Sequence, residues 1–505
     1  FEAPVVSQVP PATAASNERA HTADTILPTV VCTGAAIGLP GGDSVFSEDN
    51  IDTILKGENR ISHLAERAEA FLKKSIVKLV KDEHGQGSFS PVENVEQVIR
   101  LAGTKAHFDP TEYGIPERLA GAFDICTQLA IAAGLEALRD AHIPLVRHYK
   151  VSAKGKKVPQ GFALPKELGD STGVIFASAF PGYDKLIQHL ENDGLDDNNV
   201  FDRRFLFQIL SMGHSQFAQF IGARGPNTAV NSACASTTQA VAMASDWIKM
   251  GRCDRVIIVG ADDVTNETLL PWIGSGFLAA GAASTHDVVE EAALPFDRRR
   301  HGLILGMGAV GLVIESQRSA QERHVTPIAE LLGSSMANSA FHGTRLNPEH
   351  IAQTLTSLVS EVCTNNNLTP SKIAKNAIFM SHETYTPARG GSAGAEIAAL
   401  RAAFGENANQ IIIANTKGFT GHAMGAGIED AIALKAMQLG IIPPIANFKE
   451  PDPSLGDLRL SKGESIQADF AIRLAAGFGS QLTFLIWRRI GSGADLLASK
   501  PDYYR

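Results

Sequence analysis

Short apolar runs recur along the first half of the chain, and a stretch with helical spacing follows most of them. Apolar runs of this length are typical of strands that are buried on both faces of a parallel sheet. Strands that alternate with helices predict an α/β fold in which helices cover both sheet faces. The predicted strands are 29–38, 172–177, 228–230 and 255–260, and the predicted helices are 51–55, 120–141, 201–221 and a segment that follows residue 234 and ends at 249–251.

The second half repeats this order, with predicted strands at 377–380 and 410–415 and predicted helices at 393–404 and 422–439. In each half one strand ends in an asparagine, and a small-residue turn then leads to a reactive side chain where a helix begins. Asn231 and then Cys234 occupy these positions in the first half. Asn415 and then His422 occupy them in the second. The similarity predicts an internal duplication in which two α/β halves bring equivalent sites together.

Four segments stand outside this alternation. Residues 1–28 are rich in Pro, Ala, Ser and Thr and predict a linker that is disordered or used for docking, and 491–505 predict a second linker. Together with the missing initial Met, they predict a domain cut from a longer polypeptide. The charged segment 61–102 is interpreted as a solvated helix face, with docking to a membrane or an acidic partner as the alternative. The segment 149–168 predicts a surface loop.

The composition is that of a globular protein without a nucleic-acid signature. Hydrophobic residues make up 44% and charged residues 20% of the 505 residues, and the net charge of -9 comes without blocks of Lys and Arg. The five cysteines are widely spaced and form no C-x-x-C pair, which argues against a disulfide framework or a zinc site and for a reducing, cytoplasmic compartment. The sequence contains neither an apolar run long enough to span a bilayer nor an N-terminal signal peptide.

Cys234 has the position of a reactive thiol. It lies where a strand gives way to a helix, and the free backbone N–H groups of a helix start carry partial positive charge. This charge is expected to lower the pKa of the thiol and to favour the nucleophilic thiolate. The alternative is a buried structural cysteine, which is a common fate of unpaired cysteines.

His382 and His422 differ from the other histidines because each follows an apolar strand and has small residues beside it. A thiolate with two imidazoles suits acyl transfer on thioesters, since the sulfur accepts the acyl group while imidazole N–H groups polarise a carbonyl. Lys417 lies on the loop that leads to His422 and is interpreted as an additional positive charge in the site. A solvated surface lysine is the alternative.

Five segments carry a family resemblance. They are Asn231-Ser-Ala-Cys-Ala-Ser236, Leu294-Pro-Phe-Asp-Arg-Arg-Arg-His-Gly-Leu-Ile-Leu-Gly-Met-Gly-Ala309, His382-Glu-Thr-Tyr-Thr-Pro387, Asn415-Thr-Lys-Gly-Phe-Thr-Gly-His422 and Gly477-Phe-Gly-Ser480. In order and spacing they resemble the motifs of the β-ketoacyl synthases, the condensing enzymes of fatty-acid and polyketide synthases. The resemblance covers residues 29–489.

The resemblance implies a thiolase-like α/β fold, in which two duplicated halves stack in five α-β-α-β-α layers, and it implies a homodimer. Residues 29–325, with 61–102 as an insertion, would form the N-terminal half, and residues 326–490 the C-terminal half. The implied partners are an acyl carrier protein bearing phosphopantetheine, acyl and malonyl-type thioesters, and further synthase domains in the same polypeptide. The resemblance implies neither a metal nor an organic cofactor.

The implied reaction is a decarboxylative Claisen condensation. Cys234 would take the acyl chain, and His382 and His422 would hydrogen-bond the thioester oxygen of a malonyl-type extender. Backbone N–H groups of Cys234 and Phe478 would hold the oxyanion. The remaining residues that the resemblance implies are Lys417 as a catalytic residue, Phe478, Gly479, Thr384 and Thr386 as substrate-binding residues, and Glu396 in a supporting role.

The chain also departs from the family pattern. Glu383 and Tyr385 replace two glycines and are expected to narrow the malonyl side of the site. An alternative function is that of a domain that only binds or transfers acyl chains, without condensation. A thiolase is disfavoured because no second catalytic cysteine follows Cys363. The other departures are His301, Met307, Ser480, Leu482 and extra residues at 388–392.

Overall fold

The computed structural model describes residues 27–73, 75–81, 86–192, 204–386 and 391–490, so both predicted linkers lie outside it apart from residues 27–28. Its main sheet has twelve strands. Predicted strands 172–177 and 377–380 coincide with β8 (Thr172–Ala177) and β13 (Ala377–Met380). The strands on its main path are β1 (Val30–Gly38), β8 (Thr172–Ala177), β9 (Asn227–Val230), β10 (Arg255–Asp263), β11 (Leu305–Ser316), β12 (Ala329–Asn338), β13 (Ala377–Met380), β14 (Ile412–Ala414), β15 (Phe470–Gly477) and β16 (Gln481–Arg489).

The strand order confirms the predicted duplication. From β1 the first half runs β1-β11-β10-β8-β9, and from β12 the second half runs β12-β16-β15-β13-β14. Numbered along the chain, both halves therefore have the spatial order first, fifth, fourth, second, third. In both halves the fifth strand is antiparallel to its two neighbours, while the second strand is parallel to the third and fourth. The halves meet where β1 pairs antiparallel with β12, Val31 opposite Glu330.

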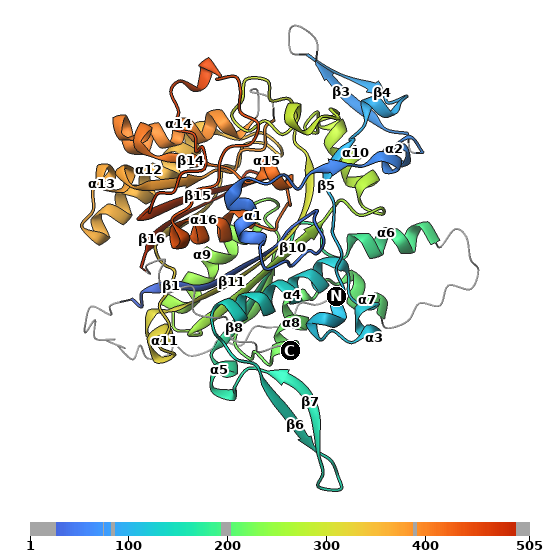
Figure 1. Cartoon of the computed structure of the whole chain (residues 1–505), viewed down its shortest axis with the longest axis vertical. Helices are drawn as coiled ribbons and strands as arrows, with labels where there is room; N and C mark the ends of the chain where they lie inside the picture. The colour runs from blue at the N-terminus through green and yellow to red at the C-terminus, as the bar shows by residue number, and fades with distance from the viewer. Residues whose placement is uncertain (1–26, 74, 82–85, 193–203, 387–390, 491–505) are drawn as a thin grey trace, which may run out of the picture.

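Helices cover the two sheet halves in layers (Figure 1). The outer face of the first half packs against α4 (Ile125–Asp140) and α8 (Gly213–Ile221), and the outer face of the second against α12 (Pro348–Asn366) and α14 (Ser392–Phe404). Between the halves, α9 (Ser236–Lys249) and α16 (Ile428–Leu439) pack against strands of both. This is the thiolase-like α-β-α-β-α arrangement that the resemblance implied.

Strand side chains alternate between these layers because successive residues of a strand point to opposite faces. In β10, Val256 and Ile258 belong to the central core, whereas Ile257 and Val259 belong to the outer core beneath α4. The central helix α16 is buried from Ile428 to Gln438, and its charged residues Glu429, Asp430 and Lys435 are buried in ion pairs. The structure thus contains three stacked cores, two outer and one central.

The remaining helices are short or flank the layers. Within the described residues, no helix combines the length and apolar character that a bilayer crossing requires. The short and flanking helices are α1 (Asn50–Lys56), α2 (Glu69–Leu72), α3 (Glu117–Ala120), α5 (Lys166–Asp170), α6 (Tyr183–Asn192), α7 (Arg204–Ile209), α10 (Leu270–Ala279), α11 (Gln317–Glu322), α13 (Pro370–Lys375) and α15 (Lys417–Thr420).

The segment 61–102 is not the helix face that its charge pattern indicated. It contains β2 (Ser62–His63), the short helix α2, a hairpin of β3 (Val77–Lys81) with β4 (Gly87–Pro91), and β5 (Leu101–Gly103), which pairs with β11. β3 carries two valines, and β-branched side chains lose rotamer freedom in a helix and favour extended backbone. The β-branched residues therefore favoured a strand over the predicted helix in this segment.

Two other predictions were also wrong. The predicted loop 149–168 largely forms a hairpin of β6 (Val146–Val151) and β7 (Lys157–Ala163), whose turn uses Gly155 at a φ of 73°. The predicted helix 201–221 is interrupted, because Ser211 adopts a φ of 48° between α7 and α8. The two appended hairpins, β3–β4 and β6–β7, project from opposite ends of the molecule (Figure 1).

Candidate active site

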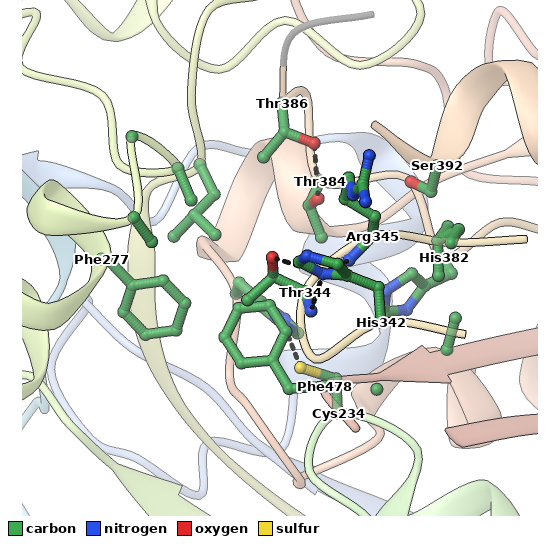
Figure 2. A pocket seen from close by; sticks show the side chains of 18 of the residues that line it. Cys234, Phe277, His342, Thr344, Arg345, His382, Thr384, Thr386, Ser392 and Phe478 are labelled. Atoms are coloured by element: carbon green, nitrogen blue, oxygen red, sulfur yellow. Dashed lines mark hydrogen bonds between the residues drawn. The ribbon is translucent and has the colours of Figure 1, made fainter. Parts of the chain in front are cut away.

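The two equivalent strand-to-helix junctions meet at the centre of the molecule. Cys234 lies between β9 and α9, and His422 lies between α15 and α16. The Cys234 Sγ is 2.9 Å from the His422 Nε2. His382 follows β13, and its ring centroid lies 5.9 Å from that of His422, with the two rings nearly perpendicular at 86°. The structure therefore brings the three sequence-predicted side chains together from both halves of the fold (Figure 2).

The turn that carries Cys234 is held by its own polar groups. Ser232 N–H donates to Ser236 Oγ at 2.9 Å, and Ala233 adopts a φ of 49°. Gly477, at the end of β15, lies against this turn, since a Cβ there would come within 2.3 Å of the Ser232 carbonyl oxygen and 3.2 Å of the Cys234 nitrogen. The sequence prediction missed Gly477 as a site residue and placed Gly479 there instead.

The predicted lowering of the Cys234 pKa is not what the structure gives. Burial raises the pKa of Cys234 to about 12, and the nearby positive charge of Lys417 opposes that rise. Burial, followed by the same lysine charge, lowers the pKa of His422 to about 3. Helix α9 begins only at Ser236, so Cys234 lies before its first turn. The resting pair is therefore a neutral thiol beside a neutral imidazole, and the imidazole is free to accept the thiol proton during attack.

This protonation state makes a prediction for chemical modification. Alkylation by iodoacetamide requires the thiolate, so the rate at Cys234 is expected to keep rising through pH 10, because its pKa is about 12. Lys417→Met removes the charge that opposes burial, which raises the pKa further and is expected to slow alkylation at pH 8 by about tenfold. Mass spectrometry of the Cys234 peptide gives the rate, with Lys372→Met, an exposed position, as control. An unchanged rate in Lys417→Met would contradict the electrostatic role.

Lys417 is buried, which excludes the solvated-lysine alternative. Its side chain is 2% exposed, and its Nζ lies 2.8 Å from Glu429 Oε1. Burial alone would raise the pKa of Glu429, but the charges of Lys417 and Arg473 hold it at about 2. Lys417 does not line the cavity described below, so it reaches Cys234 and the histidines through its charge.

Glu396 positions the start of the His382 loop. Its carboxyl accepts hydrogen bonds from Ser381 Oγ at 2.6 Å and from the His382 backbone N–H at 3.1 Å. Burial, together with the nearby carboxyl of Glu383, raises the pKa of Glu396 to about 8. Glu396 thus acts on the backbone that carries His382, in line with the supporting role expected of it.

Glu383 and Tyr385 do not narrow the cavity, which corrects the expectation for these two departures. Both side chains are fully buried and neither lines the cavity. The Glu383 carboxylate accepts a hydrogen bond from Ser392 Oγ at 2.6 Å and faces the Arg300 guanidinium at 3.8 Å. Tyr385, at a φ of 46°, donates from its hydroxyl to the Lys417 carbonyl at 3.3 Å. Thr384 and Thr386 line the cavity, so alternation along this segment turns the side chains of Glu383 and Tyr385 away from it.

A cavity of about 290 Å³ opens above Cys234 (Figure 2). The predicted residues Thr384, Thr386 and Phe478 line it, together with both histidines. Gly479 does not line the cavity. Its N–H donates to the Gly343 carbonyl at 2.8 Å. Leu303 and Gly477, which lie within two of the motifs, also line the cavity, and the lining residues outside the motifs are Leu79, Phe277, Ala280, Gly281, Ala282, His342, Thr344, Arg345, Leu346, Ser392 and Ala476.

The other departures lie away from the reacting atoms. Met307 is buried in the core of β11, and Leu482 is buried in the outer core of the second half. His301 stacks on His286 at 5.5 Å between ring centroids. Ser480 donates to the His342 carbonyl at 2.8 Å, and so ties the turn after β15 to a cavity-lining loop. Of the extra residues, 388–390 lie outside the described part of the chain.

Comparison with known proteins gives consistent family matches. The family description "Beta-ketoacyl synthase, N-terminal domain" matches residues 28–320, and "Beta-ketoacyl synthase, C-terminal domain" matches residues 328–449. The chain is 28% identical over 390 residues to the tetracenomycin polyketide synthase ketoacyl synthase alpha subunit of Streptomyces glaucescens, covering 75% of this chain and 84% of that protein. It is 26% identical over 444 residues to 3-oxoacyl-[acyl-carrier-protein] synthase 2 of Staphylococcus aureus, covering 87% and 99%.

Solved structures share the fold. A β-ketoacyl synthase from Burkholderia phymatum superposes with a TM-score of 0.71 at 22% identity, covering 92% of this chain and all of that one. A type II polyketide synthase ketosynthase, solved with its acyl-carrier protein and bound to a hexaketide, gives a TM-score of 0.69 at 21% identity, with the same coverage.

Proposed function

The chain belongs to the β-ketoacyl synthase family, and we propose that it condenses an acyl chain on Cys234 with a malonyl-type extender on acyl carrier protein, with loss of carbon dioxide. The observation that carries this proposal is the 2.9 Å contact between the Cys234 Sγ and the His422 Nε2, with His382 beside it. The product enters fatty-acid or polyketide biosynthesis.

The first step is acyl transfer. The Cys234 sulfur attacks the thioester of a carrier-bound acyl chain while His422 Nε2 accepts the thiol proton. Backbone N–H groups of Cys234 and Phe478 hold the oxyanion, and each such donor is worth about 3 kcal/mol of barrier. The bond from the acyl carbon to the phosphopantetheine sulfur then breaks, and the leaving thiolate takes the proton back from His422.

The second step forms the new carbon–carbon bond. The malonyl thioester loses carbon dioxide, and the enolate oxygen accepts hydrogen bonds from the Nε2–H group of His382 and from His422 in the tautomer that carries its proton on Nε2. Both imidazoles are neutral, since burial lowers both pKa values, and a neutral imidazole can donate in this way. The carbanion attacks the acyl group on Cys234, the carbon–sulfur bond breaks, and the Cys234 thiolate takes up a proton. No metal or organic cofactor enters the scheme.

Thr384 and Thr386 are proposed to bind the phosphopantetheine arm, because both line the cavity that also contains Cys234 and the two histidines. Lys417 is proposed to act on the catalytic residues through its charge. The partner is an acyl carrier protein, as in the related ketosynthase solved with one. The five cysteines of the chain are free, and a working Cys234 thiol suits a reducing cytoplasm.

A homodimer is part of the proposal. β9 is the last strand of the main sheet, and two of its residues, Asn227 and Ala229, are exposed. A second copy of β9 would satisfy the backbone groups on this edge. We also propose residues 29–325 and 326–490 as the two halves, and covalent linkage to further synthase domains through the flanking segments.

The test is a two-stage assay. Purified protein incubated with an acyl thioester is expected to gain the acyl mass on Cys234, measured by mass spectrometry of its peptide. Adding malonyl-carrier protein is then expected to release carbon dioxide and to yield a β-ketoacyl-carrier product. Acylation without condensation would overturn the proposal and support a domain that only binds or transfers acyl chains.

A further inference from the structure

The β3–β4 hairpin lies in the part of the chain that the family motifs do not cover, yet it reaches the cavity. Leu79, in the middle of β3, lines this cavity together with Cys234 and Phe478. We infer that the hairpin sets the substrate size and that Leu79 limits how large an acyl group reaches Cys234. This inference rests on the proposed function, because it names a specificity determinant of the same site.

The base of the hairpin is fixed against α10. Phe71, on the short helix α2 that precedes β3, is fully buried, and a Cβ on Gly274 of α10 would lie 2.8 Å from its ring. Ile76 and Ile99, on either side of the hairpin, are buried in the same cluster, which also contains Phe277 of α10. The hairpin is therefore held by a buried apolar cluster, and β3 cannot shift without disrupting it.

Leu79 itself is seated between two glycines. A Cβ on Gly281, just after α10, would lie 3.2 Å from its Cδ2, and a Cβ on Gly87 of β4 would lie 2.8 Å from its Cδ1. Gly281 also has a φ of 65°, a conformation that side chains other than glycine rarely adopt. The backbone on both sides thus leaves the space that the Leu79 side chain fills.

The cavity has one apolar and one polar side. Phe277 and Phe478 face each other at 5.6 Å between ring centroids, and they lie across from His342 and Arg345 (Figure 2). Leu79 extends the apolar side, because it lies beside Gly281, which follows α10 and also lines the cavity. An acyl chain favours this side, since burial of its methylene groups is favourable, and Leu79 closes the space available there.

Acylation of Cys234 by acetyl- and octanoyl-pantetheine tests the inference, with rates taken from intact-protein mass spectra of the full chain. Leu79→Ala is expected to raise the octanoyl-to-acetyl rate ratio about tenfold, and Leu79→Trp to lower it about tenfold, because a few methylene groups in an apolar pocket change selectivity by that order. Both rates come from the same sample, so a loss of folded protein cancels in the ratio.

Phe89→Ala is the matched control. Phe89 is the cross-strand partner of Leu79 in the hairpin, but its side chain is 67% exposed and does not line the cavity. The octanoyl-to-acetyl rate ratio of Phe89→Ala is expected to stay within about twofold of the ratio of the unaltered chain. If the octanoyl-to-acetyl rate ratio stays unchanged in both Leu79 variants while Cys234 is still acylated, the inference about Leu79 is wrong and the proposed function stands. If neither thioester acylates Cys234 in the unaltered chain, both the proposed function and the inference fall.

Discussion

His382→Ala is expected to abolish carbon dioxide release from malonyl-carrier protein while Cys234 still takes up an acyl group. The contact to the Cys234 sulfur comes from His422, and the His382 ring lies 5.9 Å from the His422 ring between centroids. The substitution therefore removes a proposed enolate donor and leaves the thiol–imidazole pair intact. Loss of one such donor costs about 10²- to 10³-fold in rate. Labelled malonyl thioester and trapped carbon dioxide give the decarboxylation rate, and the mass of the Cys234 peptide gives acylation.

The control for this prediction is His301→Ala. This imidazole is partly buried near His286 and does not line the cavity, so its removal should leave both half-reactions largely unchanged. If His382→Ala lost acylation and decarboxylation together, the histidine would hold the shape of the site instead of acting on the extender. Equal thermal unfolding of the two variants would show that the comparison is between folded proteins.

Cys234→Ala is expected to eliminate the covalent acyl adduct altogether, because no other described cysteine lines the cavity. Cys234→Ser keeps a nucleophile of similar shape, but a hydroxyl is a far weaker nucleophile than a thiol, and it should acylate at least about 10³-fold more slowly. Mass spectrometry of the intact chain measures both variants. A full acyl adduct on Cys234→Ala would place the nucleophile elsewhere and overturn the site.

Much of the fold could be predicted because buried strands and central helices have recognisable apolar patterns in the sequence. β8 and β13 were predicted at their observed bounds, since both are apolar runs buried on both faces. The correspondence of Cys234 with His422 was also visible, because each lies after the third strand of its half. Repeated topology leaves a repeated pattern of strand, turn and helix.

The appended segments were harder, because their structure depends on contacts that are distant in the chain. The hairpin of β3 and β4 is anchored where Phe71 packs against α10, a helix about 200 residues further along the chain. The pattern of charges near the hairpin does not predict that contact. Ser211 interrupts a run of helical apolar spacing through a single backbone angle. Neither feature has a local sequence signal strong enough to predict it.

The sequence indicated which side chains meet in the site, but it did not predict their pKa values. The helix-start argument for Cys234 considered the dipole alone, whereas burial outweighs it and raises the thiol pKa. The expectation for Tyr385 failed for a related reason, since the residue type was known but the direction of the side chain was not. Burial and direction both belong to the folded chain, and one sequence does not reveal either.

The shared strand order of the two halves has a historical consequence. A half-length ancestor of this topology would have associated with itself through the strand that became β1 in one copy and β12 in the other, which still pair at Val31 and Glu330. Its two junctions would have been identical by symmetry. Fusion of two such copies would leave the junctions free to differ, as Cys234 in one half and His422 in the other now do. A single polypeptide can therefore carry two different side chains at equivalent positions, which two identical subunits cannot.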